Sequence, residues 1–223
     1  MQIDLEGQKI VARGKNRDLY RHPRDAGALI KVVNASRQRK EAARSWLAQR
    51  LKPSYTREFM SEIDAVYRAH RRAQWLGVPR TRRLPIIETV GLVATSKGMG
   101  LVVERLAAPN GELAPTLKTL IEVGDFDQRR LARLNDFVER IFALRIVADD
   151  FDPKNIVWDA QSESFVMIDG FGEKPVVPIH VWSRKINDFQ LRAAIAERLA
   201  RRAGLQWDAR RRTLSFQSAT ETA

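Results

Sequence analysis

The sequence contains no cysteine and only three histidines in 223 residues. Without cysteine, the chain forms neither a disulfide framework nor a thiolate metal site. His22, His70 and His180 share no metal-binding spacing, and the sequence holds no zinc pattern, Walker loop or G-x-S-x-G motif. The hydrophobic content of 44% is ordinary for a soluble protein, and a chain of this length can bury the core of one domain or of two small lobes.

Long apolar runs are also missing, because no run reaches the roughly 20 residues that a membrane-spanning helix needs. The N-terminal segment Met1–Glu6 is short and acidic and lacks the apolar stretch of a signal peptide. We therefore expect a cytoplasmic protein without a transmembrane segment.

Basic residues, in contrast, are abundant: 39 Lys and Arg against 27 Asp and Glu give a net charge of +12. Such charge can attract nucleic acid, an anionic membrane or phosphorylated ligands. No helix-turn-helix or aromatic stacking motif accompanies the arginines, so we interpret them as solvated helix faces. Nucleic acid is the least favoured of the partners considered.

The order of apolar patterns and turn residues predicts strands first and mostly helices later. Short or alternating apolar stretches favour strands, helical spacing favours helices, and Pro and Gly mark loops. The predicted strands lie within 3–19 and at 29–33, 86–95, 100–104, 156–158 and 165–168. The predicted helices are 35–51, 56–75, 117–123, 128–144 and 182–203. Residues 20–27 are expected to form a loop.

A segment with two prolines and one glycine at 107–115 interrupts this order and is the best candidate for a hinge. We therefore predict an α+β protein of two lobes. A β-rich N-terminal lobe comprises 1–106 and a short, mostly helical C-terminal lobe comprises 107–205. Residues 206–223 are expected to be a polar tail without a fold signal.

The most informative pattern is an oxygen-rich set in the second half of the chain. Asn155 follows Asp150 by five residues, and Asp169 comes after a predicted hairpin, directly behind an apolar strand. Carboxylate and amide oxygens, together with phosphate oxygens, are the ligands that Mg²⁺ prefers. Phosphoryl-transfer sites hold a metal–nucleotide complex in this way and use one further carboxylate to orient the attacking hydroxyl. Lys31 adds a cation within an apolar strand, where burial calls for an anionic neighbour.

These residues resemble a known family. The run Asp150–Asn155 is similar to the D-x-x-x-x-N catalytic loop of the protein-kinase-like superfamily, and Asp169 resembles its metal-binding acid. Within that superfamily, the chain is most similar to the PhoP regulatory network protein YrbL family. The similar stretches are 18–25, 30–33, 77–80, 98–103 and 168–172. The resemblance implies a two-lobed protein-kinase-like fold.

The resemblance also implies roles for three side chains. Lys31 would orient the nucleotide phosphates, and Asp150 would act as general base or align the acceptor hydroxyl. A glutamate of the predicted helix 56–75 should pair with the lysine. Glu62 borders the inward side of this helix and is our choice, whereas Glu58, one turn earlier, remains the alternative.

The remaining implied site residues concern the nucleotide and the metal. Asn155 and Asp169 would hold Mg²⁺, and ATP is the implied nucleotide. Gly14 occupies the position of the phosphate-covering loop, flanked by cations but with only one glycine. Glu104 and Leu106 lie, by position alone, where backbone groups would contact the adenine ring.

Three residues depart from the protein-kinase pattern. Ala148 and Asp149 stand where protein kinases carry His and Arg, and Asp152 stands where those acting on Ser or Thr use Lys. The run is closer to the D-L-H-P-x-N form of kinases that act on small molecules. We therefore expect a small-molecule or envelope-related acceptor rather than a protein.

Two functions follow from the sequence. The first is an ATP- and Mg²⁺-dependent phosphotransferase, which we favour slightly because every catalytic residue type is present. The alternative is a regulatory pseudokinase that acts through a protein partner, as the name of the resembled family implies. The irregular glycine loop favours this second reading.

Overall fold

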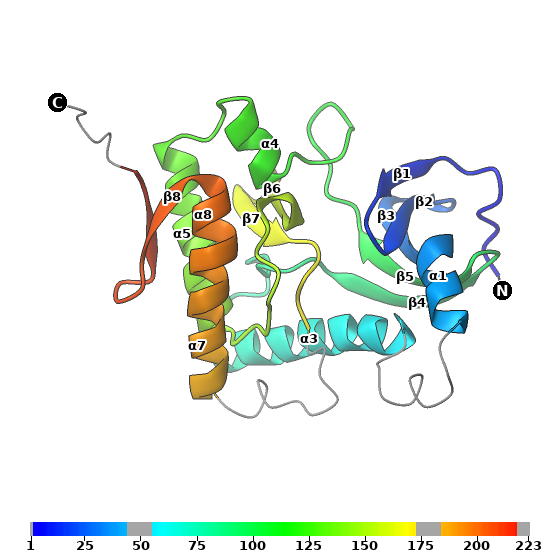
Figure 1. Cartoon of the computed structure of the whole chain (residues 1–223), viewed down its shortest axis with the longest axis horizontal. Coiled ribbons are helices and arrows are strands. Elements are labelled where there is room, and N and C mark those ends of the chain that lie inside the picture. The colour runs from blue at the N-terminus through cyan, green and yellow to red at the C-terminus, as the bar shows by residue number, and fades with distance from the viewer. Residues whose placement is uncertain (1, 44–54, 173–183, 218–223) are drawn as a thin grey trace.

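The computed structural model describes residues 2–43, 55–172 and 184–217. It shows a mixed α+β protein with a β-rich N-terminal region and a mainly helical C-terminal part (Figure 1). Helix α3 (Tyr55–Trp75) runs along the bottom of the view, beneath the sheet and as far as the helices of the C-terminal part. It corresponds to the helix predicted at 56–75.

The N-terminal region is built on a five-stranded antiparallel sheet with the strand order β1-β2-β3-β5-β4. Its strands are β1 (Ile10–Arg13), β2 (Arg17–His22), β3 (Asp25–Val33), β4 (Thr89–Thr95) and β5 (Gly98–Glu104). In the central strand β3, Lys31 is paired with Leu19 of β2 and Leu101 of β5. A short helix, α1 (Ala35–Ala42), follows β3.

The two faces of this sheet pack against different cores, since successive side chains of a strand point to opposite faces. Ile30 and Val32 belong to a small cluster on one face. Leu29 and Val33 belong to the main core, which also contains Phe59 of α3. The alternation therefore places Lys31 on the face that α3 covers.

The C-terminal part combines helices with one buried hairpin. Its elements are α4 (Leu117–Glu122), α5 (Gln128–Ala143), the 3-10 turn η1 (Pro153–Asn155), β6 (Ile156–Asp159), β7 (Ser164–Met167), α7 (Arg184–Ala194), the π-helical turn η2 (Ile195–Ala200) and α8 (Arg201–Ala203). Asp127 caps α5 by accepting a hydrogen bond from the Arg130 amide. The apolar side chains at helical spacing along α5 are buried in the main core.

The prediction of a loop at 20–27 is wrong. Strand β2 continues to His22 and β3 begins at Asp25, so only two residues form the turn. Pro23 favours a tight turn because its ring fixes φ. Tyr20, assigned to the loop, is 3% exposed in the small core.

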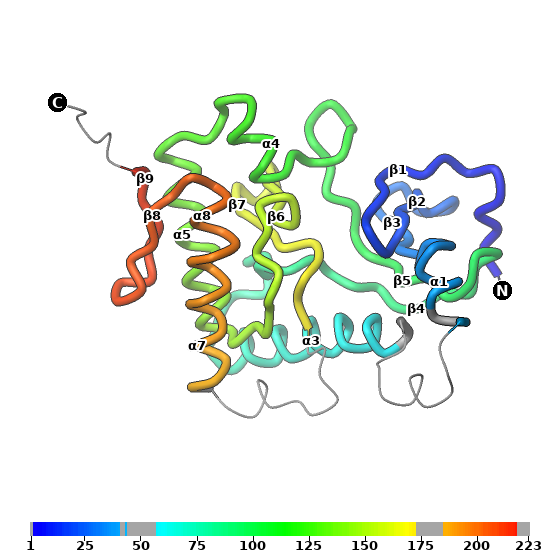
Figure 2. Tube along the Cα trace, viewed as in Figure 1, coloured from blue at the N-terminus to red at the C-terminus, as the bar shows by residue number. Residues whose placement is uncertain are grey.

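The prediction of a polar tail from residue 206 onward is also wrong, because residues up to 216 form two strands. Strands β8 (Leu205–Asp208) and β9 (Thr213–Phe216) form an antiparallel hairpin beside α5 (Figure 2). Leu205 and Leu214 are buried in the main core. Asn135 of α5 binds Leu214 twice, accepting from its amide at 2.7 Å and donating to its carbonyl at 2.9 Å. Because an arginine-rich turn separates the two strands, the sequence does not show the two buried leucines as parts of one hairpin.

The helix predicted at 35–51 corresponds to α1 in its first half, and 44–54 lie outside the described residues. The helix predicted at 182–203 corresponds to α7, η2 and α8 from Arg184 onward. Among the helices of the described ranges, none is long and apolar enough to cross a membrane.

Candidate functional site

Lys31 is buried at the junction of the sheet, α3 and the end of β7. Its ammonium lies 3.1 Å from a carboxylate oxygen of Glu62 and donates a hydrogen bond to the carbonyl of Ile168 at 2.7 Å. Both charged residues are less than 5% exposed. Of the two glutamates considered from the sequence, Glu62 is therefore the one that the structure places against the lysine.

Glu58 faces two arginines instead. Arg17 of β2 lies 3.4 Å from its carboxylate, and Arg37 of α1 forms a second ion pair with it. Arg17 also hydrogen-bonds the second carboxylate oxygen of Glu62 and lies 3.6 Å from Asp169. This arginine thus connects the Lys31 pair to the proposed metal-binding acid.

The pKa of Arg17 reflects this environment. Burial disfavours the charged guanidinium, but the carboxylates of Glu62, Asp169 and Glu58 outweigh burial and raise the pKa above its ordinary value. The guanidinium also lies 5.1 Å from the centre of the Phe59 ring. Arg17 is therefore a permanent cation in the middle of the site.

In the sequence, Arg17 stands out only as one of the cations that flank Gly14. Its position depends on strand register, because Arg17 is paired with Val33 and Leu19 with Lys31. Arg17 and Lys31 are thus diagonal neighbours on one face of the sheet. Only a correct prediction of the two-residue turn between β2 and β3 would have revealed this.

The loop that carries Asp150 and Asn155 folds onto the segment that follows β7. The Asn155 side-chain amide donates to the Asp150 carboxylate at 3.0 Å, and the Asn155 carbonyl accepts from the Ile168 amide at 2.8 Å. The Asp149 amide donates to the Gly170 carbonyl at 3.1 Å. These bonds bring together the two segments that contain the three predicted oxygen donors.

Asp169 itself is half exposed, with 52% of its side chain accessible. One of its carboxylate oxygens accepts from the Gly170 amide at 2.8 Å. The preceding residue, Ile168, binds Lys31 through its carbonyl and Asn155 through its amide. The proposed metal ligands and the strand lysine therefore meet at one short segment of backbone.

Gly170 permits the close approach of the two segments. Its φ is 84°, and a Cβ added there would lie 2.6 Å from the Cβ of Asp150. Both the backbone conformation and the space exclude a side chain. The glycine after the acid in the sequence is thus part of the site geometry.

Asp152, which departs from the protein-kinase pattern, is turned toward cations of the chain. It caps η1 by accepting from the Lys154 amide at 3.1 Å, and the Lys154 ammonium lies 3.3 Å from it. Arg202 of α8 forms a further ion pair with the same carboxylate. Asp152 therefore anchors the C-terminal helix to the loop, and its charge is balanced locally.

Replacement of Asp152 by Asn is expected to lower stability in a pH-dependent way. Burial raises the pKa of Asp152, but the Lys154 amide, the Lys154 ammonium and Arg202 outweigh burial and hold the pKa below its ordinary value of 3.8. A depressed pKa contributes stability above the unfolded-state value, and that contribution disappears as the pH falls through the folded-state value. Urea unfolding should show a difference between wild type and Asp152→Asn at pH 7 that shrinks below pH ~4. A difference that is constant with pH would contradict this role.

The remaining candidates make local contacts, and within the described residues only Gly14 of the three bonds a residue of the site. Gly14 forms the turn into β2, where its amide donates to the Arg17 carbonyl at 2.8 Å. The carboxylate of Glu104 accepts from the Glu88 amide at 2.8 Å, and the carbonyl of Leu106 accepts from the Ala114 amide at 3.0 Å. Their contact with a nucleotide stays a prediction.

The donor set fits a magnesium ion shared with a ligand. Within the described parts of the chain, no group of three or more His, Cys, Asp or Glu side chains is arranged to hold a metal by itself. Asn155 and Asp169 offer one amide and one carboxylate, and Mg²⁺ is commonly held by one or two carboxylates together with phosphate and water oxygens. The residues present therefore fit an ion that arrives with a phosphate ligand.

The fold and site define a mixed α+β protein in which a buried lysine–glutamate pair is linked through Arg17 to Asp169. Comparison with known proteins assigns the family: the model described as "PhoP regulatory network protein YrbL" matches residues 3–202, and the chain belongs to this family. It is similar to proteins named "Uncharacterized protein YrbL" from Escherichia coli (strain K12) and Shigella flexneri. Each is 28% identical over 192 residues, covering 82% of this chain and 79% of the relative.

Proposed function

We propose that the chain has a protein-kinase-like fold that binds ATP with Mg²⁺ and transfers a phosphoryl group to a small-molecule or envelope-related acceptor. The observation that carries this proposal is the contact between Lys31 and the Ile168 carbonyl, 2.7 Å apart. This contact joins a lysine of the sheet, paired with Glu62 of the covering helix, to the residue that precedes Asp169. Such an arrangement supports a site for a nucleotide–metal complex.

In this proposal each step of binding and transfer is assigned to particular residues. Lys31, held by Glu62, would bind the nucleotide phosphates, and Asn155 and Asp169 would hold the ion. Bound Mg²⁺ would supply positive charge to the phosphate oxygens. The Asp150 carboxylate would accept a hydrogen bond, and finally the proton, from the acceptor hydroxyl. The Asn155 amide and Arg198, which lies 3.3 Å from Asp150, hold this carboxylate in place.

A regulatory pseudokinase within the PhoP network is the second candidate. Arg17 favours it, because its guanidinium lies between Glu62 and Asp169, where it supplies positive charge next to the proposed metal site. A permanent cation there can replace the ion in holding the site together. Function would then reside in protein contacts, as the name of the family suggests.

Replacement of Asp150 by Asn tests the catalytic role. We expect ADP formation from ATP and Mg²⁺ to fall at least about 100-fold, since general acid–base groups contribute factors of about 10²–10⁴. Nucleotide affinity, measured by calorimetry, should stay unchanged because Asp150 contacts the acceptor. Asp149→Asn is the matched control, because it changes the adjacent acid, and this variant should retain activity.

Two results would contradict the proposed phosphotransferase activity. Loss of nucleotide binding in Asp150→Asn would assign this residue a structural role. A wild-type protein that binds nucleotide but forms no ADP, with a metabolite extract as the source of acceptors, would favour the pseudokinase.

A further inference from the structure

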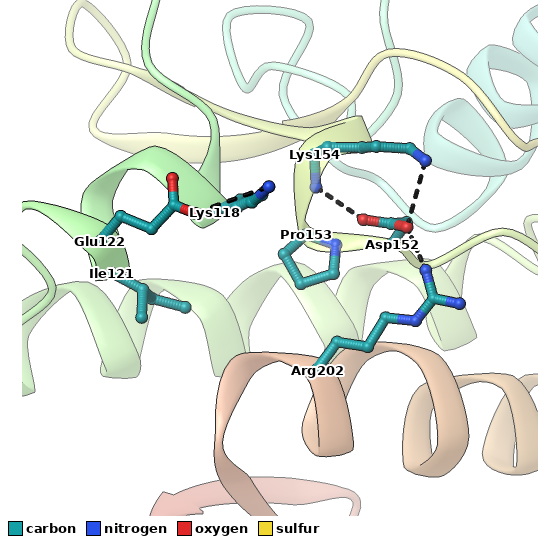
Figure 3. A pocket seen from close by; sticks show the side chains of 7 residues that line it. All are labelled: Lys118, Ile121, Glu122, Asp152, Pro153, Lys154 and Arg202. Carbon is teal, nitrogen blue, oxygen red and sulfur yellow. Dashed lines mark hydrogen bonds and ion pairs between the residues drawn. The ribbon is translucent and has the colours of Figure 1, made fainter. Parts of the chain in front are cut away.

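A pocket of about 330 Å³ lies beside the Asp150 loop (Figure 3). It is formed where α4, the 3-10 turn η1 and α8 come together. The residues that line it are Lys118, Ile121, Glu122, Asp152, Pro153, Lys154 and Arg202. Its volume lies within the range of small-molecule sites in proteins.

The side chains of the pocket carry an excess of positive charge. Three cations, Lys118, Lys154 and Arg202, come from three different elements, against two carboxylates. One carboxylate, Asp152, serves both Lys154 and Arg202. Glu122 lies 3.5 Å from Lys118 in an exposed pair along α4, which contributes little energy. The surplus cation favours an anionic ligand.

The pocket and the Asp150 carboxylate lie next to each other along the C-terminal helix. Arg198 contacts Asp150, and Arg202, four residues later, contacts Asp152. Arg198 lies in the π-helical turn η2 and Arg202 in α8, so the two acid–arginine contacts join neighbouring turns of the helix to loop residues two positions apart. A small molecule anchored in the pocket can therefore extend to the Asp150 carboxylate.

We propose that this pocket binds an anionic group, a phosphate monoester or a carboxylate, of the acceptor. This assignment rests on the proposed phosphotransferase function. Lys118, Lys154 and Arg202 attract the anion, and Ile121 and Pro153 supply the apolar part of the lining. The anion orients the molecule so that its hydroxyl reaches Asp150.

Two substitutions on α4 of opposite charge test the pocket without disturbing Asp152. Inorganic phosphate and, separately, acetate are titrated at constant ionic strength while backbone amide resonances are followed by NMR. The resonances compared are those of Lys118–Glu122 and Lys154 at the pocket and those of Gly14–Arg17 at the proposed nucleotide site. Lys118→Gln should weaken anion binding about two- to fivefold, and Glu122→Gln should strengthen it by a similar factor, as expected for exposed charges. Lys97→Gln, which changes an exposed lysine of the turn between β4 and β5, is the control without effect. The anion that binds more tightly, phosphate or acetate, identifies the anionic group of the acceptor as a phosphate monoester or a carboxylate.

The outcomes separate this inference from the proposed function. Absent resonance shifts, shifts confined to Gly14–Arg17, or equal effects of the two α4 substitutions would overturn the pocket assignment. Failure of Mg²⁺ and ATP to bind, with phosphate binding intact, would overturn the acceptor role and leave an anion site. Opposite effects of the two substitutions, together with intact nucleotide binding, would support both.

Discussion

Replacement of Glu62 by Leu is expected to destabilise the protein by about 3–5 kcal/mol, because it leaves a buried charge without its partner. Lys31 is 4% exposed and would retain only the Ile168 carbonyl. Arg17 would also lose one of its three carboxylates. Urea unfolding measures this loss as a shift of the transition midpoint.

Glu58→Leu is the matched control for this substitution. Glu58 lies one turn earlier on the same helix and pairs with Arg17 and Arg37, but its side chain is 23% exposed. We expect a cost of about 1 kcal/mol or less, since solvent screens these pairs. The double variant Lys31→Met with Glu62→Leu should recover most of the loss, because an apolar pair can replace a buried ion pair. Equal costs at the two glutamates would contradict the buried pair.

Replacement of Gly170 by Ala should destabilise the protein by about 2–5 kcal/mol. The left-handed backbone costs a residue with a Cβ about 1–2 kcal/mol, and overpacking adds about 1–3 kcal/mol. The added Cβ would meet the Asp150 carbonyl at 2.8 Å as well as its Cβ at 2.6 Å, so the two segments must separate. We therefore expect loss of nucleotide binding together with lower stability.

Gly111→Ala separates the contribution of space from that of backbone conformation. Gly111 has a φ of 80°, close to that of Gly170, but no atom lies within 4 Å of an added Cβ. This variant should lose only about 1–2 kcal/mol and should bind nucleotide as the wild type does. If the two alanine variants were equally stable, the contact between Asp150 and Gly170 would not constrain the site.

The secondary structure that the sequence predicted well rests on strong local patterns. Helix α5 carries apolar residues at helical spacing and begins after a capping aspartate, and its range agrees with the predicted 128–144 to within one residue. Lys31 could be singled out in the sequence because its charge interrupts an apolar strand. The structure supplies the anionic partner that burial requires, in Glu62.

The features that the sequence did not reveal depend on contacts between distant residues. The hairpin β8–β9 contains only two well-buried apolar residues, Leu205 and Leu214, on either side of an arginine-rich turn. Two hydrogen bonds tie the hairpin to Asn135 of α5, which lies 79 residues before Leu214 in the sequence. The position of Arg17 likewise depends on register and on carboxylates 41 and 45 residues away.

The role of Asp152 shows how a family pattern can mislead about charge. From sequence, an acid in place of lysine adds negative charge near the transferred phosphoryl group. In the structure, Lys154 and Arg202 neutralise this acid, and Arg202 comes from a helix 50 residues later. The proposal of a small-molecule acceptor therefore no longer rests on an uncompensated charge at Asp152.

Calorimetric titration with a non-hydrolysable ATP analogue, with and without Mg²⁺, tests the central claim most directly. We predict one binding site whose affinity depends on Mg²⁺ in the wild type, with the dependence on the metal abolished in Asp169→Asn. Asp136→Asn, which changes an acid of α5 paired with Arg82, should bind as the wild type does. Absence of binding by the wild type, or equal affinity in Asp169→Asn with and without the metal, would contradict the nucleotide–metal site.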